Sequence, residues 1–427
     1  MSNFRLRGIY RKLCVLVILS AADVNSGHAA DEAAVAAPIE GSSAPWWEKK
    51  WAAGDWNGER SRLEEKGFVF EFTYTGEVRS NFKGGINTAD ATEYLANVNA
   101  SVDFFTDKMG LYEGGEYFIR FENVHGKGIS ATDVGDVQLL SSIDAQPFNQ
   151  VSECFYRHSL LDNRLHFKIG KQDGTGDFIA LKYGADFTHS SYGCMANVPL
   201  PRFHNEALGA VASYDALSWF SFGTGVYDSR STGKTTGFDT AFGRPFHEFS
   251  IFEMSFKPNL TPSLPGVYRF GTWHERRDLA EIGLADPPVP PLRSIKHNFG
   301  AYMNFDQLIY KKSEKPEDDR GLGIFGQLSW TPDDRNAGAR YFGAGVRYKG
   351  IFSGRNEDIV GAGITDLIFS ERLKRTEGKT SESAIEAFYK VRATPFMWFQ
   401  PDFQYIVRPG GNGRDAVTGG MRFQIAF

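Results

Sequence analysis

The stretch FVFEFTYTGEV, residues 68–78, alternates apolar and polar side chains with a period of two. One face carries Phe68, Phe70, Phe72, Tyr74 and Val78, and the other carries Glu71, Thr73, Thr75 and Glu77. Because successive side chains of a β-strand point to opposite faces, this stretch predicts a strand with one apolar and one wet surface. Its length also matches the roughly 9–11 residues that a tilted strand needs to cross a hydrocarbon layer.

The same alternation recurs along the whole chain. It is present in EYFIRFE (116–122), ARYFGAGVRYKGIF (339–352), AIEAFYKVRA (384–393), WFQPDFQYIV (398–407) and TGGMRFQIAF (418–427). In the last of these, every second residue from Met421 to Phe427 is apolar. An unpaired strand at that position would invite aggregation. We therefore expect it to pair with residues 68–78 and close a cylinder.

A soluble β-sandwich also alternates, so the two architectures must be separated. Sandwich strands usually run for about five or six residues, with turns every eight to twelve. Many runs here are of membrane-crossing length, and aromatic residues stand near the ends of segments, as interfacial girdles require. The expected girdle residues are Tyr94, Trp219, Trp273, Trp330 and Trp398. Together these features favour a membrane barrel.

The predicted fold class is therefore all-β: a transmembrane, antiparallel, up-and-down β-barrel of about 16 strands with a short N-terminal helical segment. The expected strands are 68–78, 94–107, 115–124, 151–161, 164–171, 207–215, 217–227, 248–257, 266–274, 297–306, 321–331, 340–350, 359–367, 384–393, 398–407 and 417–427. The longest connections then all lie at one end of the barrel, as the external loops of outer-membrane barrels do.

Composition and motifs narrow the function. A net charge of −5 with scattered basic residues argues against nucleic-acid binding. The histidines are spread over different segments without a metal-binding spacing, and no nucleotide loop or nucleophile elbow is present. We therefore expect no cofactor, no metal and no catalytic residue. Two rival functions stay open: a barrel-embedded hydrolase, marked by a Ser/His constellation on the membrane exterior, and an adhesin or receptor that binds through external loops.

The N-terminal region predicts export. Basic residues precede the apolar stretch LCVLVILSAA (13–22), and small residues follow, which is the layout of a secretory signal peptide over residues 1–30. Residues 31–45 are rich in Ala and Pro and predict a flexible linker. Residues 46–67 predict a helical segment, either a solvated surface helix or one at the periplasmic mouth. Residues 68–427 then form the barrel.

Several stretches also resemble the motifs of a known family, in their residues and in their order along the chain. They are GDWNGERSRLEEKGFVFEFTYTGEV (54–78), GKQDGTGDFIALKYGADFTHSSYG (170–193), GRNEDIVGAGITDLIFS (354–370) and IEAFYKVRATPFMWFQPDFQYIVRPGGN (385–412). In these the chain resembles the carbohydrate-selective porins of Gram-negative outer membranes (OprB type). Asn57, Lys171 and His189 stand where that family more often has Gly, Arg and Asn, which bears on specificity. The resemblance implies a cell-outer-membrane porin for passive diffusion of small sugars into the periplasm, with Phe427 as an assembly signal.

A barrel of about 16 strands is wide enough to hold a water-filled lumen, so its inward residues can line a route. The connection 172–206 is the longest external loop and is the candidate constriction; the alternative is an outward lid. The candidate pore and constriction residues are Arg120, Glu122, Glu153, Arg157, Lys168, Lys171, Asp173, Asp177, Lys182, Asp186, Arg347, Lys390 and Arg392. The alternative for each residue is that its charge is solvated on the inner wall and takes no part in solute passage, because any charge on a barrel strand must face inward.

Two points on covalent structure and partners remain open from the sequence. Cys154 and Cys194 survive processing, and a disulfide between them would pin the long loop at the rim; the alternative is two free, buried thiols. The expected partners are small sugars and outer-membrane lipid, with no nucleic acid. A homotrimer, and a general or ion-conducting pore in place of a sugar-selective one, are also left open.

Overall fold

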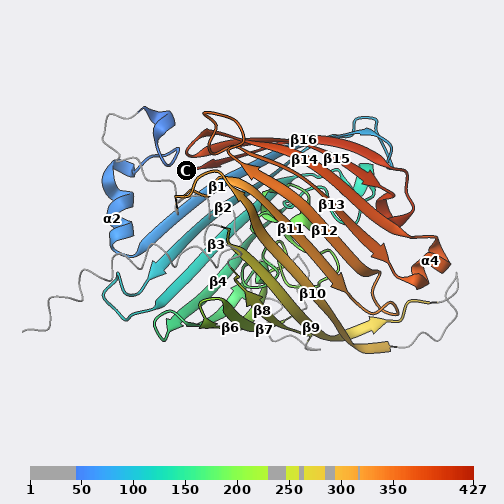
Figure 1. Cartoon of the computed structure of the whole chain (residues 1–427), viewed down its shortest axis with the longest axis horizontal. Helices are drawn as coiled ribbons and strands as arrows, with labels where there is room; N and C mark the ends of the chain where they lie inside the picture. Colours follow the sequence, from blue (N-terminus) through green and yellow to red (C-terminus); the bar gives the residue numbers. More distant parts are fainter. Residues whose placement is uncertain (1–44, 229–246, 259–263, 284–293, 316–317) are drawn as a thin grey trace, which may run out of the picture.

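The computed structural model describes residues 45–228, 247–258, 264–283, 294–315 and 318–427. Over these residues, sixteen antiparallel strands close into a barrel in which each strand pairs with its neighbours in sequence and β1 pairs with β16 (Figure 1). The strands are β1 Phe68–Lys83, β2 Thr92–Phe105, β3 Gly115–Gly126, β4 Phe148–Leu160, β5 Leu165–Gln172, β6 Ala207–Leu217, β7 Phe220–Asp228, β8 Glu248–Phe256, β9 Gly266–Ala280, β10 Ser294–Lys311, β11 Gly321–Trp330, β12 Gly338–Lys349, β13 Ile359–Phe369, β14 Ser381–Thr394, β15 Met397–Val407 and β16 Ala416–Ala426.

The predicted barrel is therefore confirmed, with every expected strand present and only its ends shifted. The largest shift of a single end is at β9, which runs to Ala280 where 274 was expected, and β10 extends beyond the expected 297–306 at both ends. The seam is also as expected, since Tyr74 pairs with Ile425 and Val78 with Met421. The expected signal peptide, 1–30, and residues 31–44 of the expected linker lie outside the described residues.

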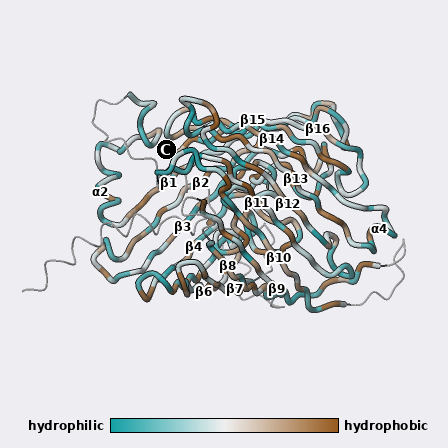
Figure 2. The backbone as a smooth tube through the Cα atoms, in the orientation of Figure 1, coloured by the Kyte–Doolittle hydropathy of each residue, from teal (hydrophilic) through white to brown (hydrophobic). Residues whose placement is uncertain are grey.

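The outer surface of the barrel is apolar, as the alternation predicts. On β3, the side chains of Tyr117, Ile119 and Phe121 are 46%, 41% and 43% exposed, whereas Phe118 between them is 8% exposed. Brown and teal segments alternate along the strands in Figure 2, in keeping with this period of two. Lipid therefore solvates one face of each strand, and the other face lines the interior.

The aromatic girdle is only partly as expected. Tyr94, Trp219 and Trp330 are exposed on the outside. Trp273 and Trp398, however, are buried, so their assignment to the girdle was wrong. Both lie near strand ends, but their position in the alternation places them on the inner face. Trp398, for example, donates its indole Nε1–H to Gln424 Oε1 at 2.9 Å.

Helices are few and short. They are η1 Trp46–Glu48, η2 Trp56–Gly58, α2 Glu59–Glu65, η3 Ser130–Val134, η4 Gly174–Gly176, η5 Gly184–Asp186, α3 Ser190–Gly193, α4 Glu371–Glu377 and η6 Pro409–Gly411. Helix α4 was not expected; it lies in a connection that the sequence suggested was a plain loop. Among the described residues, no helix is both long and apolar enough to cross a membrane.

The N-terminal helical segment holds the seam of the barrel. In α2, Arg60 is 1% exposed and donates from Nη1 to the Phe427 oxygen at 2.7 Å and from Nη2 to the Phe70 oxygen at 2.5 Å. Its guanidinium also lies 3.9 Å from the ring centroid of Trp51. One arginine thus joins β1 to the residue that follows β16, and α2 lies beside this end of the barrel in Figure 1. We call it the terminal end, and the opposite end the loop end.

Two connections from the loop end fold into the barrel. The connection between β5 and β6, 173–206, packs Phe178, Met195 and other apolar side chains against the inner wall from β6 to β13 and against Phe388 of β14. The connection between β3 and β4, 127–147, packs Ile129, Val134 and Leu140 against inward residues of β14, β15 and β16. The interior is therefore partly filled by chain, and the outward-lid alternative for 172–206 does not describe this structure.

Candidate functional site

The predicted residues on β3, β4 and β5 form one charged cluster inside the barrel. Arg120 Nη1 lies 2.6 Å from Glu153 Oε2, and Lys168 forms an ion pair with Asp177 of the inward loop. Arg157 Nη1 lies 3.1 Å from Glu116 Oε2. The alternation of these strands places positive and negative groups side by side on the wet face, which gives the wall both donors and acceptors.

The loop-end part of the same cluster is more deeply buried. Lys171 donates from Nζ to the Val151 carbonyl at 2.8 Å, and Glu122 is 5% exposed. Asp173 donates its backbone N–H to Glu153 Oε1 at 2.9 Å. The structure thus brings these predicted residues together with Asp173, and Glu153 both pairs with an arginine and anchors the inward loop.

A second predicted group forms around Asp186 of the inward loop. Its carboxylate lies 2.7 Å from Arg347 Nε on β12 and 3.4 Å from Lys390 Nζ on β14. The long loop therefore meets two cations of the far wall, Arg347 and Lys390, through one carboxylate. Two predicted residues stay outside both groups: Lys182 has an exposed side chain, and Arg392 lies nearer the terminal end.

Sequence reasoning missed the most buried charge network, which spans the seam. Arg79 donates from Nη1 to Asp402 Oδ2 at 2.8 Å and from Nη2 to Asp402 Oδ1 at 3.0 Å, and its Nε donates to Glu77 Oε1 at 2.9 Å. Arg422 Nε donates to the other oxygen of Glu77 at 2.7 Å. The expected pairing of residues 68–78 with the last strand already brought Glu77 and Arg422 to one seam, but Arg79 lies beyond that expected strand, and its pairing with Asp402 was not predicted.

Wall carboxylates also anchor the loop backbone, a role the sequence did not suggest. Glu253 accepts the Ile179 N–H at 2.9 Å, and Asp306 accepts the Lys182 and Tyr183 N–H groups at 3.0 and 2.9 Å. On β14, Glu386 accepts two further loop N–H groups. Each buried acceptor satisfies donors that a loop inside a barrel would otherwise leave unpaired.

The second inward loop, 127–147, is held in the same way. Glu382 of β14 accepts the Val137 and Gln138 N–H groups, each at 2.9 Å.

His189, on the neighbouring inward loop, is buried beside Arg79. Burial first, and then the positive charge of Arg79, lower the pKa of His189 to about 3. The imidazole is therefore neutral at physiological pH, and its Nδ1 accepts the Ser191 N–H at 3.3 Å.

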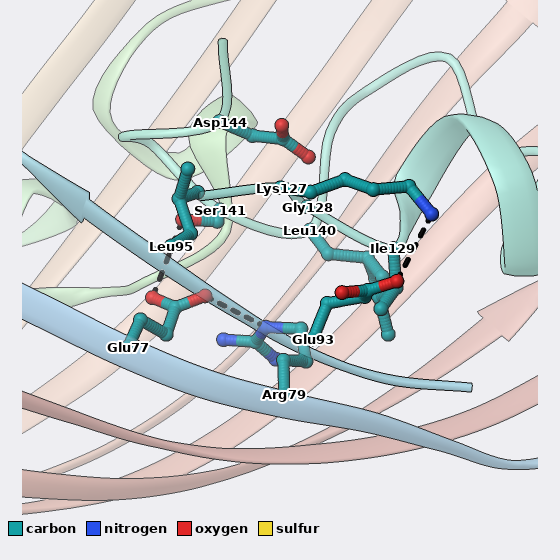
Figure 3. A pocket seen from close by; sticks show the side chains of 10 residues that line it. All are labelled: Glu77, Arg79, Glu93, Leu95, Lys127, Gly128, Ile129, Leu140, Ser141 and Asp144. Atoms are coloured by element: carbon teal, nitrogen blue, oxygen red, sulfur yellow. Dashed lines mark hydrogen bonds and ion pairs between the residues drawn. The ribbon is translucent and has the colours of Figure 1, made fainter. Parts of the chain in front are cut away.

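Two cavities open along the charged side of the interior. The first lies toward the loop end, between β1, β2 and the connection 127–147 (Figure 3). Its lining combines carboxylates, cations, a hydroxyl and apolar side chains: Glu77, Arg79, Glu93, Leu95, Lys127, Gly128, Ile129, Leu140, Ser141 and Asp144. The second lies toward the terminal end and is lined by Lys349, Glu357, Lys390, Arg392 and Trp398. Both offer polar groups close to an apolar surface, which suits a polyhydroxylated solute.

The suggested disulfide is not formed, because Cys154 and Cys194 are both free thiols. Cys154 lies on β4 between inward Glu153 and inward Phe155, so its side chain points to the outer face. Cys194 lies in the inward loop, where its Sγ contacts Arg202 Nη1 at 2.6 Å. The wall of the barrel separates the two sulfur atoms.

A closed barrel of sixteen strands, apolar outside and charged inside, with a loop folded into its lumen, defines a transmembrane porin. Residues 89–427 match the carbohydrate-selective porin family, OprB family. The chain therefore belongs to this family, and it forms a sugar-selective channel in the outer membrane of a Gram-negative bacterium.

Individual relatives are distant in sequence. Porin B of Pseudomonas aeruginosa is 24% identical over 88% of this chain and 91% of its own length. QuiX of Acinetobacter baylyi is 21% identical over 89% of this chain and 94% of its own. The high-pH structure of Pseudomonas putida OprB superposes with a TM-score of 0.79 at 20% identity, covering 89% of this chain and 99% of that one. At this identity the structural likeness shows the fold alone.

Proposed function

We propose that small sugars cross the barrel passively along its charged side, past β1 to β5 and β14 to β16. The observation that carries this is the series of paired donors and acceptors on those strands, from the network of Arg79 and Asp402 to the pair of Arg120 and Glu153. Hydroxyl groups of a sugar can exchange hydrogen bonds with such groups step by step. Each contact must stay weak, because a site that holds its solute tightly also slows its release.

The inward loop 173–206 sets the width of this route. Its aromatic residues fill the space in front of β6 to β13, and its Thr188 accepts a hydrogen bond from Arg79 Nη2 at 3.1 Å, so the loop also narrows the charged side. Asp177 and Asp186 then extend from the loop to Lys168 on one wall and Arg347 on another. This supports the predicted role of the loop as the constriction and of these residues as its lining.

We further propose that the terminal end faces the periplasm. Both the segment 46–67 and the end of β16 lie there, and most of the longest connections lie at the other end, which is the usual asymmetry of outer-membrane barrels. In this orientation solutes pass the cavity of Figure 3 first and the cavity of Trp398 second. The expected signal peptide, 1–30, is consistent with export to this location.

A channel, and no enzyme, is the activity that the site supports. One Ser–His–Asp arrangement does occur: Ser159 Oγ lies 2.9 Å from His166 Nδ1, and His166 Nε2 lies 3.8 Å from Asp215 Oδ2. It lies on the inner face of β4 and β5, whereas a lipid-cleaving barrel would need it on the outside. The Ser159 backbone N–H is also already bonded to the Gly114 carbonyl and cannot stabilise an oxyanion.

The proposal is tested by swelling of liposomes that contain the purified full chain. We expect fast uptake of monosaccharides, slower uptake of disaccharides and little uptake of trisaccharides. Lys168→Ala should change the sugar flux, and the matched control Lys66→Ala, an exposed position outside the lumen, should not. Equal rates for all sugars and for small ions would instead support a general pore. Tight sugar binding without permeation would support an adhesin.

Whether three barrels associate is a separate proposal, and the size of the detergent-solubilised protein decides it. A homotrimer predicts a particle of about three barrels by light scattering. Apolar residues on the outer face, such as Phe252 and Phe270, are exposed in the single chain and are available to lipid or to a second barrel. A particle with the size of a single barrel would contradict the homotrimer proposal.

A further inference from the structure

We propose that the terminal-end cavity lined by Lys349, Glu357, Lys390, Arg392 and Trp398 is a binding station for the carboxylate of an acidic sugar, such as an aldonic or uronic acid. This rests on the proposed sugar passage and adds a substrate class to it. A neutral sugar would use the same station through its hydroxyl groups only.

The cations of this cavity lie close together because of the strand register. Ile359 of β13 pairs with Lys349 on one side and with Lys390 on the other. One step further toward the terminal end, Arg392 of β14 pairs with Trp398 of β15. The three cations therefore project from one patch of wall, from β12 and β14 on either side of β13, and their backbone positions are set by the sheet.

Their counter-charges, by contrast, come from connections. Lys349 Nζ lies 2.8 Å from Asp319 and 2.9 Å from Glu357, and these two carboxylates are 50% and 38% exposed. Lys390 Nζ pairs with Asp186, which belongs to the inward loop. Ion pairs to exposed carboxylates on turns contribute little, so the carboxylate of a passing solute can replace them. Lys349, fixed on a strand with its acids on turns, is therefore the exchangeable part of the anion site, whereas Asp186, the partner of Lys390, is only 10% exposed.

The wall beneath the cations suits the rest of an acidic sugar. Trp398 is held in place by the hydrogen bond of its Nε1 to Gln424 Oε1 at 2.9 Å, and Lys390 Nζ lies 4.6 Å from its ring centroid. A sugar can set its C–H face near the indole, its carboxylate near the cations and a hydroxyl group against Glu357. The aromatic ring thus orients the ring of the solute, and the cations select its charge.

The loop-end cavity has the opposite balance of charges. It contains three carboxylates, Glu77, Glu93 and Asp144, with two cations, whereas the terminal-end cavity contains three cations with one carboxylate. An acidic solute is therefore favoured at the second cavity relative to the first. This gradient draws an anion toward the terminal end, and because the exchangeable pairs are weak it does not trap the solute there.

The test compares gluconate with glucose, which share a carbon skeleton and differ in charge. The full chain is reconstituted in bilayers; gluconate permeability relative to K⁺ is read from the reversal potential, and glucose flux from liposome swelling. We expect Lys349→Gln and Arg392→Gln each to lower the ratio of gluconate permeability to glucose flux about threefold to tenfold, because the lost charge attracts gluconate and not glucose. Arg392→Lys, which keeps the charge, should retain most of the gluconate permeability.

The control Lys66→Gln removes the same charge at the same end of the barrel, outside the lumen, and should change neither readout. Unchanged gluconate permeability in the Lys349→Gln/Arg392→Gln double variant, with normal glucose flux, overturns the inference. An equal loss in Arg392→Gln and Arg392→Lys overturns it as well, since charge would then not be the cause. Absence of glucose flux through the unaltered protein is a different failure, because it contradicts the proposed sugar passage itself.

Discussion

The two sides of the barrel interior use the same strand alternation for opposite purposes. From β6 to β13 the inward positions often carry glycine or an aromatic residue, and the loop 173–206 packs against them. A Cβ at Gly323 would lie 2.4 Å from the Tyr183 ring, and one at Gly363 would lie 2.7 Å from the Tyr192 ring. On β1 to β5 and β14 to β16 the inward positions are mostly charged or amide side chains.

The difference shows how a barrel wall becomes either a core or a channel lining. On the first side, small wall residues let aromatic loop residues approach closely and exclude water, as in a soluble protein core. On the second side, ion pairs such as that of Arg79 with Asp402 occupy much of the wall, and the connection 127–147 packs there against small or single apolar residues, Ala384, Ile406 and Ala416. The polarity of the wall therefore determines where the proposed sugar route runs, and the apolar packing of the loop makes that route narrower.

The largest expected effect comes from breaking the packed side. Phe187 lies with its ring centroid 4.2 Å from that of Tyr192 and 4.9 Å from that of Phe388. Phe187→Ala should cost about 3–5 kcal/mol of packing and free the loop from the wall. We expect single-channel conductance to rise severalfold and the discrimination between sugars of different size to fall. Phe252→Ala, on the lipid face, is the control, and equal conductance in both variants would contradict the assigned role of the loop.

The next effect comes from breaking the charged side. Arg79→Met leaves the buried carboxylates of Asp402 and Glu77 without their shared cation, which should cost about 3 kcal/mol. The lumen should then become more selective for cations, and sugar flux should change by about tenfold. Reversal potentials in a salt gradient measure the first change and liposome swelling the second. Arg79→Lys keeps the charge but not the paired bonds to Asp402, so an effect as large as that of Arg79→Met would show that geometry, and not charge, governs selectivity.

A smaller, pH-dependent effect is expected in the cavity of Figure 3. Burial, and then the charge of Glu77, raise the pKa of Asp144 to about 6. The folded state therefore holds this proton more tightly than the unfolded chain, and packing of the connection 127–147 should weaken as pH rises from about 4 to about 6. The protection factors of the amides in that segment, which correct for the intrinsic pH dependence of hydrogen exchange, should be higher at pH 4.5 than at pH 7. Asp144→Asn should reduce the difference without removing it, because burial also raises the pKa of Asp136 in the same connection, to about 8, and the exposed control Asp107→Asn should leave the difference unchanged.

The smallest effect is expected at the rim of the charged side. Arg157 pairs with Glu116 at 3.1 Å but is 29% exposed, so the pair should contribute no more than about 1 kcal/mol. Arg157→Ala should alter sugar flux by about twofold to threefold and leave the barrel folded. A heat-modifiability gel checks the fold, and Arg62→Ala on the exposed face of α2 is the control. A change as large as that of Arg79→Met would mean that the constriction lies at this rim.

Much of the fold could be predicted because strand alternation is a local property. Positions such as Phe118 and Ile119 differ in exposure as their neighbours in sequence require, and every expected strand is present. The same reasoning failed at Trp273 and Trp398, where closeness to a strand end was weighed above the alternation that turns them inward. It also could not show that the connection 127–147 fills part of the lumen.

The candidate site was predicted as a set of inward charges but not as a set of pairs. Arg120 and Glu153 lie opposite each other on the consecutive strands β3 and β4, so their pairing follows from the register of neighbouring strands, even though the long connection 127–147 joins them. Arg79 and Asp402 meet only because β1 and β16 close the seam with β15 behind them, and Cys154 fails to reach Cys194 because the wall stands between them.

By itself the sequence determined which residues face lipid and which face the lumen, since a strand turns alternate side chains to opposite sides whatever its partners are. Only the tertiary structure decided which inward residues touch one another, which half of the interior is dry and where two cavities of opposite charge open. Those properties depend on the closure of the barrel and on the path of two loops, and both are contacts between segments far apart in the chain.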